Sequence, residues 1–172
     1  MDTFQSIYNR RSIRKFTEET VPDHLVKELM KAAMSAPSAM NQQPWHFIVI
    51  NDRQLLEEIA EIQGGYAMLK RAPMAILVCG EEDKAKLKQF WPLDLAAATE
   101  NILIAAQPLG LGVTWCGVYP TREFIIKLQE ILKLPETITP FSLIPVGFPD
   151  ETKAKGDRFI GERIHRNGWG PF

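Results

Sequence analysis

The most apolar helical stretch of the sequence is LDLAAATENILIAAQ, residues 93–107. It is apolar nearly all the way round a helix, and such a helix lies in the middle of its fold or in a subunit interface. Three consecutive small residues, Ala96-Ala97-Ala98, would let another backbone approach closely. The stretch therefore predicts a helix that is buried either in the middle of the fold or in a subunit interface.

Four apolar runs on either side of this helix are typical of buried strands, because they are rich in β-branched and aromatic residues. They are 45–50 (WHFIVI), 74–79 (MAILVC), 113–118 and 141–146. Helices are expected over about 23–34, 52–62 and 121–133, with a short helix from Asp2 to about Arg11. Interleaved strands and helices indicate a layered α/β or α+β fold, whose strand order and direction stay open.

The bulk composition fits one compact domain, residues 1–172, because 45% of the residues are hydrophobic and 24% are charged. A net charge of −1 gives no reason to expect nucleic-acid binding, which depends on a basic surface. No apolar run approaches the roughly 18 residues of a membrane span, and residues 1–5 lack the basic start of a secretory signal. We therefore expect a cytoplasmic protein with no membrane partner.

The cysteines and histidines do not suggest a metal site. Cys79 and Cys116 lie in separate apolar runs, and the three histidines are scattered along the chain. A zinc site needs clustered thiols or imidazoles. We expect two buried thiols and no bound metal.

A basic cluster is the first feature that could carry chemistry. Arg10-Arg11-Ser12-Ile13-Arg14-Lys15 holds four of the 20 basic residues. If this segment is extended, alternation places Arg10, Ser12 and Arg14 on one side. Two guanidinium groups and a hydroxyl suit a phosphate dianion, because arginine binds phosphate oxygens bidentately. The alternative is a solvated basic turn.

Two loops could complete a ligand site. The amide-rich loop 37–45 (PSAMNQQPW) offers donors and acceptors that match the edge of a heteroaromatic ring, or it satisfies its own backbone as a turn. Residues 112–120 (GVTWCGVYP) run from a strand into a turn with glycine, where backbone N–H groups could face a flavin or an oxyanion. Taken alone, each signal leaves both interpretations open.

Several familiar motifs are absent from the sequence. It has no Gly-x-Gly-x-x-Gly after a strand, no phosphate loop of the Walker type and no serine nucleophile elbow. It also offers no evident pair of residues for acid–base or nucleophilic catalysis. Redox chemistry centred on a cofactor fits this pattern, because the cofactor carries the reaction.

Taken in order, the motifs resemble the FMN-dependent nitroreductase family, in particular its short members. They are Arg-Arg-Ser-x-Arg-x-Phe at 10–16, Pro-Ser-x-x-Asn-x-Gln-Pro-Trp-x-Phe at 37–47 and Gly-Leu-Gly at 110–112. The tail 158–169, Arg-Phe-x-x-x-x-x-His-x-Asn-x-Trp, is also similar to that family. The resemblance implies an α+β fold with a central, mainly antiparallel sheet flanked by helices. It also implies an interlocked homodimer that binds two FMN molecules at the subunit interface.

The resemblance also assigns the FMN contacts. It implies that the N-terminal cluster binds the phosphate and the ribityl chain, and that a late arginine also contacts the phosphate. It further implies that loop 37–41 of the partner subunit contacts the flavin. Residues 115–118 would contact the edge of the flavin ring through their backbone. The residues are Arg10, Arg11, Ser12, Arg14, Pro37, Ser38, Ala39, Asn41, Trp115, Cys116, Gly117, Val118 and Arg158. Lys70 or Arg71 is the nearest candidate for a further cation near the ring.

The implied activity is electron transfer from NADH or NADPH through flavin N5 to an electron-poor small molecule such as a nitroarene or quinone, with no protein side chain as the catalytic group. An FMN-binding module without nicotinamide turnover is the main alternative. Other enzymes on the same fold and a flavinless interaction domain also stay open. Phe90 and Trp91 either lie near the substrate mouth or pack under the central helix.

Overall fold

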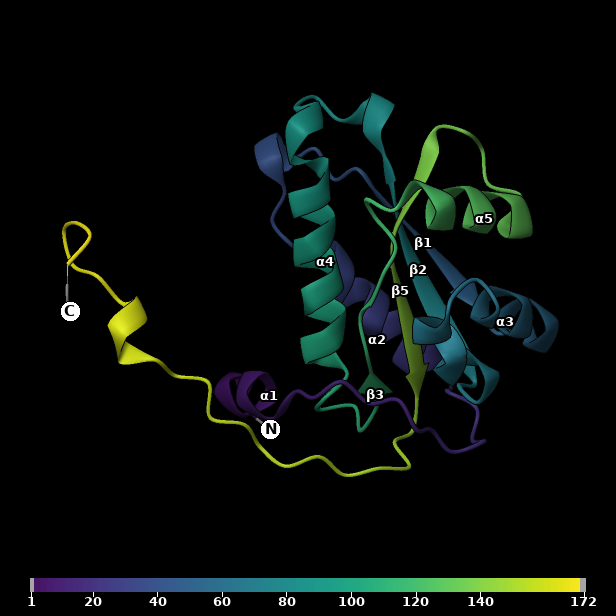
Figure 1. Ribbon diagram of the computed structural model, residues 1–172, viewed down its shortest axis with the longest axis horizontal. Helices are drawn as coiled ribbons and strands as arrows, with labels where there is room; N and C mark the ends of the chain where they lie inside the picture. The colour runs from purple at the N-terminus through teal and green to yellow at the C-terminus, as the bar shows by residue number, and fades with distance from the viewer. Residues whose placement is uncertain (1, 171–172) are drawn as a thin grey trace.

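The computed structural model describes residues 2–170 and has one twisted sheet (Figure 1). Its strands are β1 (Trp45–Ile50), β2 (Met74–Glu81), β3 (Gly112–Val113), β4 (Cys116–Gly117) and β5 (Ile138–Gly147). The order is β1-β2-β5-β3, and β4 also pairs with β5. Every one of these strand pairs is antiparallel, so the expected α+β fold with a mainly antiparallel sheet is confirmed.

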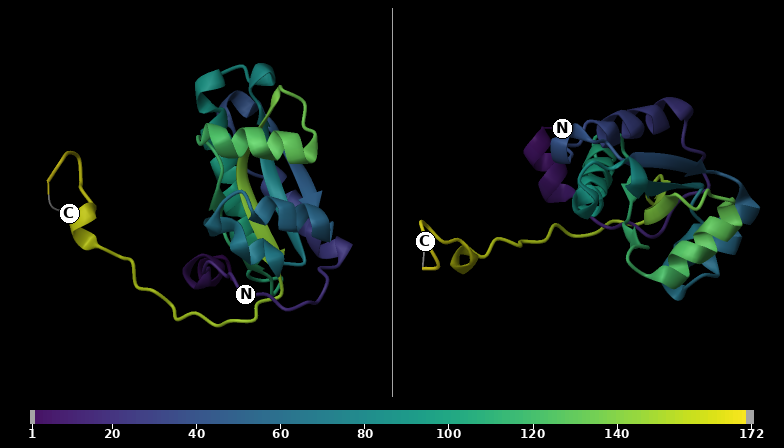
Figure 2. Two further views of the ribbon diagram at one scale, coloured as in Figure 1. Left: turned by 45° about the vertical axis from the view of Figure 1, so that its right-hand side comes forward. Right: turned by 90° about the horizontal axis from the view of Figure 1, so that it is seen from above.

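Helices cover both faces of this sheet (Figure 2). Those with defined bounds are α1 (Thr3–Asn9), α2 (Asp23–Met34), α3 (Arg53–Ala60), α4 (Trp91–Ala105) and α5 (Arg122–Leu132). Alternate residues of β2 point to opposite faces: Ile76 and Val78 pack with α2 and α4, whereas Ala75 and Leu77 pack with α3 and α5. The sheet is therefore buried on both sides.

The central helix α4 is buried on the side that faces the sheet. Leu95, Ala98 and Ile102 are all fully buried. On its outer side Leu93 is 64% exposed, although the helix is apolar nearly all round. The expected burial is therefore complete on one side only within this protomer.

Asp2 and Asp52 cap their helices as expected. Their carboxylates accept the N–H of Gln5 and of Leu55 at 2.9 and 3.0 Å. Thr121 occupies the N-cap position of α5, but its side chain makes no capping hydrogen bond. Two helices end earlier than expected, α1 at Asn9 and α3 at Ala60, and a 3₁₀ helix covers Gly64–Lys70.

The expected strand at 113–118 is interrupted. β3 and β4 keep one register on β5, since Val113 lies opposite Val146 and Cys116 opposite Leu143. This register brings Thr114 opposite Pro145, which has no N–H to donate to the ladder. A single strand over 113–118 was therefore wrong, because its partner cannot complete the hydrogen bonds.

After Asp150 the chain first runs along residues 8–15 and then extends away from the body of the protein as a tail (Figures 1 and 2). Its one helical turn is Gly161–Arg163. Phe159 and Trp169 are 77% and 93% exposed. Within the described residues, no helix is both long and apolar enough to cross a membrane.

Candidate functional site

The segment after α1 is extended, as the alternation argument requires. Ser12 forms a parallel bridge with Val113, and the Ile13 N–H donates to the Val113 carbonyl at 2.9 Å. Ile13 and Phe16 are buried, whereas Arg14 is exposed. The edge of the sheet therefore holds this segment with the Arg14 side chain available to a ligand.

The two leading arginines have different surroundings. Arg10 Nε lies 3.6 Å from Glu100 Oε1 on α4, so an acidic side chain is near it. Arg11 Nε donates to the Ala154 carbonyl at 2.9 Å, and its Nη1 donates to the carbonyl oxygens of Tyr8 and Arg10. Its Nη2 is buried and has no hydrogen-bond partner among residues 2–170.

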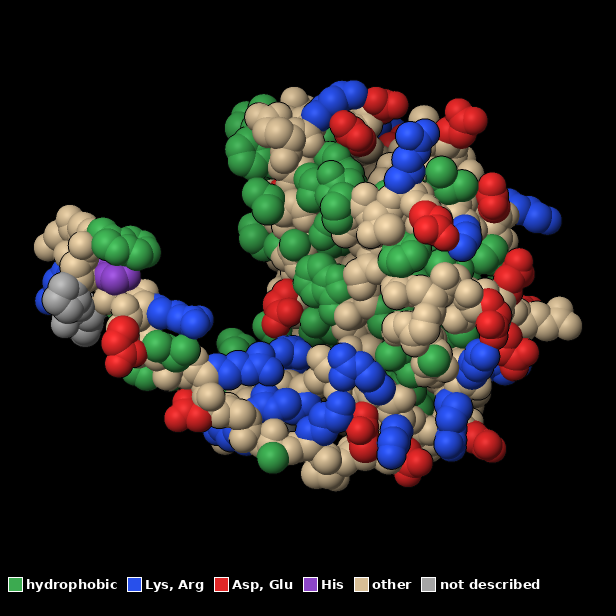
Figure 3. Space-filling view, in the orientation of Figure 1, with side chains coloured by type: hydrophobic (Ala, Val, Ile, Leu, Met, Phe, Trp, Pro, Cys, Tyr) green, Lys and Arg blue, Asp and Glu red, His purple; other side chains and the backbone are tan. Residues whose placement is uncertain are grey.

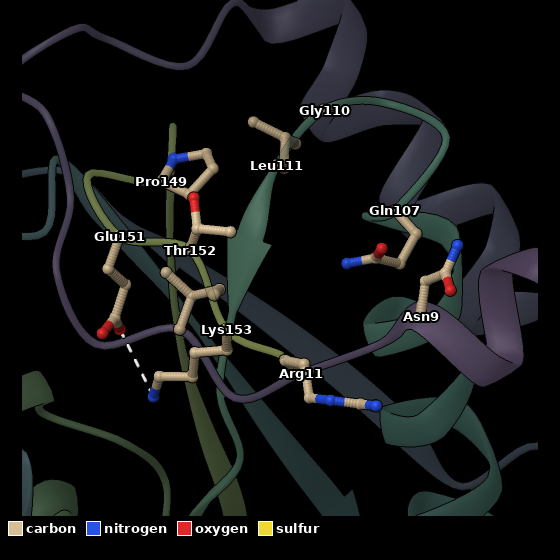
Figure 4. Close-up of a pocket in the computed structure, with 10 residues that line it drawn as sticks. Asn9, Arg11, Gln107, Gly110, Leu111, Pro149, Glu151, Thr152 and Lys153 are labelled. Carbon is tan, nitrogen blue, oxygen red and sulfur yellow. Dashed lines mark ion pairs between the residues drawn. The ribbon is translucent and has the colours of Figure 1, made fainter. Parts of the chain in front are cut away.

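The start of the tail brings more positive charge to the same place (Figure 4). Lys153 Nζ donates to the Ser12 carbonyl at 2.6 Å and lies 3.4 Å from Glu151 Oε1. Lys155 Nζ lies 5.6 Å from the centre of the Tyr8 ring. Arg11 and Lys153 line a hollow of about 220 Å³, and Figure 3 shows Lys and Arg side chains gathered on this side of the molecule.

Sequence reasoning chose Arg158 from the tail and missed Lys153 and Lys155. The signal was available in the run TKAKGDR (152–158), which holds three basic residues within six positions, Lys153, Lys155 and Arg158. Arg158 lies close to the cluster too: a Cβ added at Gly156 would be 3.5 Å from Arg11 Nη2 and 3.8 Å from Arg158 Nε.

The expected ring-edge segment contacts the 3₁₀ helix at 64–70. Cys116 Sγ lies 3.9 Å from the Gly65 carbonyl oxygen and 3.9 Å from Met68 Sδ. Burial raises the pKa of the Cys116 thiol to about 11, while the charge of Arg14 opposes the shift. The Arg14 charge therefore lies near enough to Cys116 on β4 to favour its thiolate.

Gly117 and its neighbours differ in what they offer a ligand. A Cβ added at Gly117 would meet nothing within 4 Å, so there is open space beside it. Val118 is fully buried and its N–H donates to the Phe141 carbonyl at 3.3 Å, so this protomer does not leave it open to a ligand, whereas Trp115 is 37% exposed. Sequence reasoning missed Tyr66, whose hydroxyl donates to the Gly117 carbonyl at 2.7 Å; burial raises the pKa of Tyr66 to about 12.

Loop 37–43 lies at the other end of the central helix from α1. The Ala39 N–H donates to Asp94 Oδ1, in the first turn of α4, at 2.8 Å. Arg10, in contrast, approaches Glu100 in the second half of α4. Within one protomer the structure therefore does not bring the basic cluster and loop 37–43 together.

The two aromatic candidates for the substrate mouth lie in different environments. Trp91 is 4% exposed, and its ring packs against Tyr119 and Phe141 with centroids 4.9 and 6.1 Å apart. Phe90 is 39% exposed and lines a hollow of about 290 Å³ with Pro37, Ser38 and Ala39. This favours core packing for Trp91 and leaves the mouth hypothesis to Phe90.

The candidates for a further cation lie elsewhere. Lys70 Nζ pairs with Glu61 at 2.6 Å, and both Lys70 and Arg71 line a different hollow with Arg53 and Glu18. Neither lines the hollow beside Arg11. Within residues 2–170, no three His, Cys, Asp or Glu side chains are grouped so that they could hold a metal ion.

The antiparallel sheet and the helices that cover it form a fold that other proteins share. A family model described as the nitroreductase family matches residues 7–65 and 63–148. A protein of Archaeoglobus fulgidus, provisionally named NADH dehydrogenase/NAD(P)H nitroreductase, is 44% identical over 172 residues, which cover 98% of this chain and 99% of that protein. The chain belongs to the nitroreductase family.

Solved structures agree with this assignment. A Parabacteroides distasonis protein with the same provisional name superposes with a TM-score of 0.93 and 38% identity, covering 97% of this chain and 98% of that one. A provisionally named nitroreductase of Desulfovibrio desulfuricans, solved in complex with FMN, gives a TM-score of 0.84 and 27% identity over 98% of both chains. The resemblance inferred from the sequence motifs is confirmed at the level of family and fold.

Proposed function

We propose that this protein is an FMN-dependent oxidoreductase that passes electrons from NADH or NADPH through the flavin to an electron-poor acceptor, such as a nitroarene or quinone. The names of its relatives and the FMN complex of the Desulfovibrio protein support this class of reaction. The observation in this chain that carries the proposal is the buried, unpartnered Nη2 of Arg11 beside a basic hollow.

The residues of that hollow fit a flavin phosphate. A buried guanidinium nitrogen without a partner is costly unless a ligand supplies an acceptor. Lys153 adds a second positive charge, with Glu151 3.4 Å from it in the same hollow. Arg11 Nε and Nη1 already donate to backbone carbonyls, so Nη2 is the nitrogen of Arg11 that would donate to a phosphate oxygen. Arg11 and Lys153, which both line the hollow, would hold the phosphate, with Arg10 and Arg158 close by.

The segment Cys116–Gly117 would line the ring. The open space beside Gly117 leaves room for a flat group, and the Tyr66 hydroxyl fixes the Gly117 carbonyl from behind. Bound FMN would supply the two-electron chemistry, for which the sequence offers no evident pair of side chains. Arg14, which already acts on Cys116, would favour the more negatively charged form of the ligand.

We propose further that the working unit is a homodimer. Loop 37–41 and the basic cluster lie apart within one protomer, so a flavin contacting both needs loop 37–41 from a partner subunit. The tail carries exposed apolar side chains away from the body, which a partner would cover. The exposed side of α4, with Leu93, offers a surface for the same contact.

The decisive experiment is a visible spectrum of the purified protein, with FMN added if needed, followed by anaerobic addition of NADH and then NADPH. We expect about one bound FMN per chain and bleaching by at least one donor. A protein that binds FMN but stays oxidised with both donors would instead be a flavin-binding module. A protein that takes up no FMN would contradict the proposed cofactor.

A further inference from the structure

Asp94 is a buried carboxylate that the proposed reaction does not use. Its side chain lies in the first turn of α4 and the residue is 4% exposed. One oxygen, Oδ1, accepts the Ala39 N–H at 2.8 Å, and the other, Oδ2, accepts Nε2 of Gln42 at 2.5 Å. Burying a charge costs free energy unless hydrogen bonds compensate for it. Both oxygens of this charge are committed to one loop.

Gln42 connects that loop to a third segment. Its Oε1 accepts the Leu87 N–H at 2.9 Å, and its Nε2 also faces the Leu87 carbonyl at 3.4 Å. The Leu87 N–H needs an acceptor and the Asp94 carboxylate needs a donor. A single orientation of the Gln42 side-chain amide supplies both, because its oxygen faces Leu87 and its nitrogen faces Asp94. Gln42 thereby joins α4, loop 37–43 and the segment that leads into Phe90.

The loop has a backbone that needs such support. Met40, Asn41 and Gln43 have φ values of 51°, 51° and 47°, in the left-handed region that favours glycine. Residues held there persist only where the surroundings determine their conformation. Ser38 helps from within the loop, since its Oγ accepts the Gln43 N–H at 3.1 Å, but the anchor to the body is Asp94 with Gln42.

We propose that Asp94 and Gln42 form a positioning pair, which presents Ser38, Ala39 and Asn41 to the flavin bound at the partner's site. The inference rests on the proposed function. Because Gln42 also holds Leu87, the pair ties the Phe90 segment to the same anchor. FMN affinity and the KM for the acceptor therefore both depend on this pair.

A charge exchange within the pair tests the proposal. In Asp94→Asn, the side-chain NH₂ group of the new residue faces the NH₂ group of Gln42, so two donors lie opposite each other. In Gln42→Glu, the new carboxylate faces the carboxylate of Asp94. The double variant restores the match, since the carboxylate introduced at position 42 can accept from both the new amide at 94 and the Leu87 N–H. Each single variant should weaken FMN binding about tenfold or more, the cost of an unsatisfied buried group, and the double should recover to within about threefold of the wild type.

The matched control is Asn101→Asp, the reverse exchange of acid and amide on the same helix. Asn101 Nδ2 donates to the Ala32 carbonyl at 2.9 Å, away from the loop. This variant should lower the thermal midpoint and leave FMN affinity and the KM for the acceptor unchanged. If it weakens FMN binding as much as Asp94→Asn at equal loss of stability, the role of the pair is merely structural and the proposal is overturned.

The outcomes separate this inference from the proposed function. A wild-type protein that binds no FMN refutes the function, whereas a wild type that binds FMN with the same affinity as both single variants refutes the positioning pair. If the charge variants do not fold, Gln42→Ala keeps the bond between Asp94 and Ala39. It should still weaken FMN binding and raise the KM for the acceptor, and unchanged values would overturn the inference.

Discussion

Arg14 is the residue of the basic cluster (residues 10–15) that lies near strand β4. Its charge acts on the Cys116 thiol, and its exposed side chain leaves it available to a ligand. Arg14→Ala should weaken FMN binding by about 1.5–3 kcal/mol, the range for a hydrogen bond to a charged group. Fluorescence titration with FMN measures the change.

Lys15→Ala is the control for Arg14→Ala. Lys15 is the next residue, also basic and exposed, and in an extended segment it points to the opposite side. Its replacement should leave FMN affinity unchanged. An equal loss in both variants would show a general effect of charge and would contradict a specific contact by Arg14.

Glu151 makes a contribution to stability that depends on pH. The pKa of Glu151 lies below the ordinary 4.5, mainly because the Arg14 N–H donates to its carboxylate. Burial raises the pKa, whereas the Lys15 N–H and the charge of Lys153 lower it further. A depressed folded pKa stabilises the protein above the unfolded pKa, and this stability is lost as the pH falls through the folded pKa. Glu151→Gln should therefore lower the urea midpoint at neutral pH.

The same difference should shrink as the pH falls below 4.5, because protonated Glu151 resembles Gln. Glu136→Gln, on the exposed turn before β5, serves as the control and should leave the midpoint unchanged at both pH values. If the gap between wild type and Glu151→Gln persists unchanged into acid, the charge of Glu151 is not its cause.

At the scale of elements, the contact of β3 with the basic segment depends on a glycine. A Cβ at Gly112 would lie 2.7 Å from Ile13 Cγ2 and 3.0 Å from Ile13 Cβ, so Ile13 would have to move. Gly112→Ala should lower the free energy of unfolding by about 1–3 kcal/mol, the usual cost of overpacking. Because Ile13 lies between Ser12 and Arg14, FMN binding should weaken as well.

Gly117→Ala on β4 provides the contrast, since its added methyl meets nothing within 4 Å. The free energy of unfolding should stay within about 0.5 kcal/mol of the wild type, as for an exposed substitution without special contacts. FMN affinity should fall, because the methyl would occupy the space proposed for the ring. Chemical denaturation and FMN titration on the same samples separate the two effects, and a large loss of stability in Gly117→Ala would contradict this geometry.

The types of most elements could be predicted from local patterns, because apolar periodicity and capping act over a few residues. Asp2 and Asp52 cap their helices as expected, and β1 matches its expected bounds. The division of 113–118 into β3 and β4 could not be predicted. It depends on Pro145 in a partner strand that only the tertiary register identifies.

For the whole molecule, the tail is the element with the least support from its own protomer. Replacing Phe159, Ile164 and Trp169 together by Ser removes exposed apolar surface without touching Arg158. This variant should lose dimer stability, measured by sedimentation velocity across a range of concentrations, because burial of apolar surface drives association. The control is Ile126→Ser, which replaces an exposed apolar residue on α5, a helix on the face of the sheet opposite α4. This variant should leave dimer stability unchanged.

Two outcomes would contradict this picture. Sedimentation of the FMN-bound wild type as a monomer would refute the homodimer and, with it, a site shared between subunits. A triple variant that stays as tightly dimeric as the wild type would show that the tail is not the arm that holds the partner.

Residue types and short spacings were enough to predict the helices, most strands, the basic cluster and the family, because each of these depends on nearby residues. Only the tertiary structure brought Lys153 to Ser12 and Glu151 to Arg14, and placed Asp94 under the loop at Ala39. Each of these contacts joins residues far apart in the chain. Their meeting depends on the antiparallel path of β5 and on the packing of α4, which no local pattern specifies.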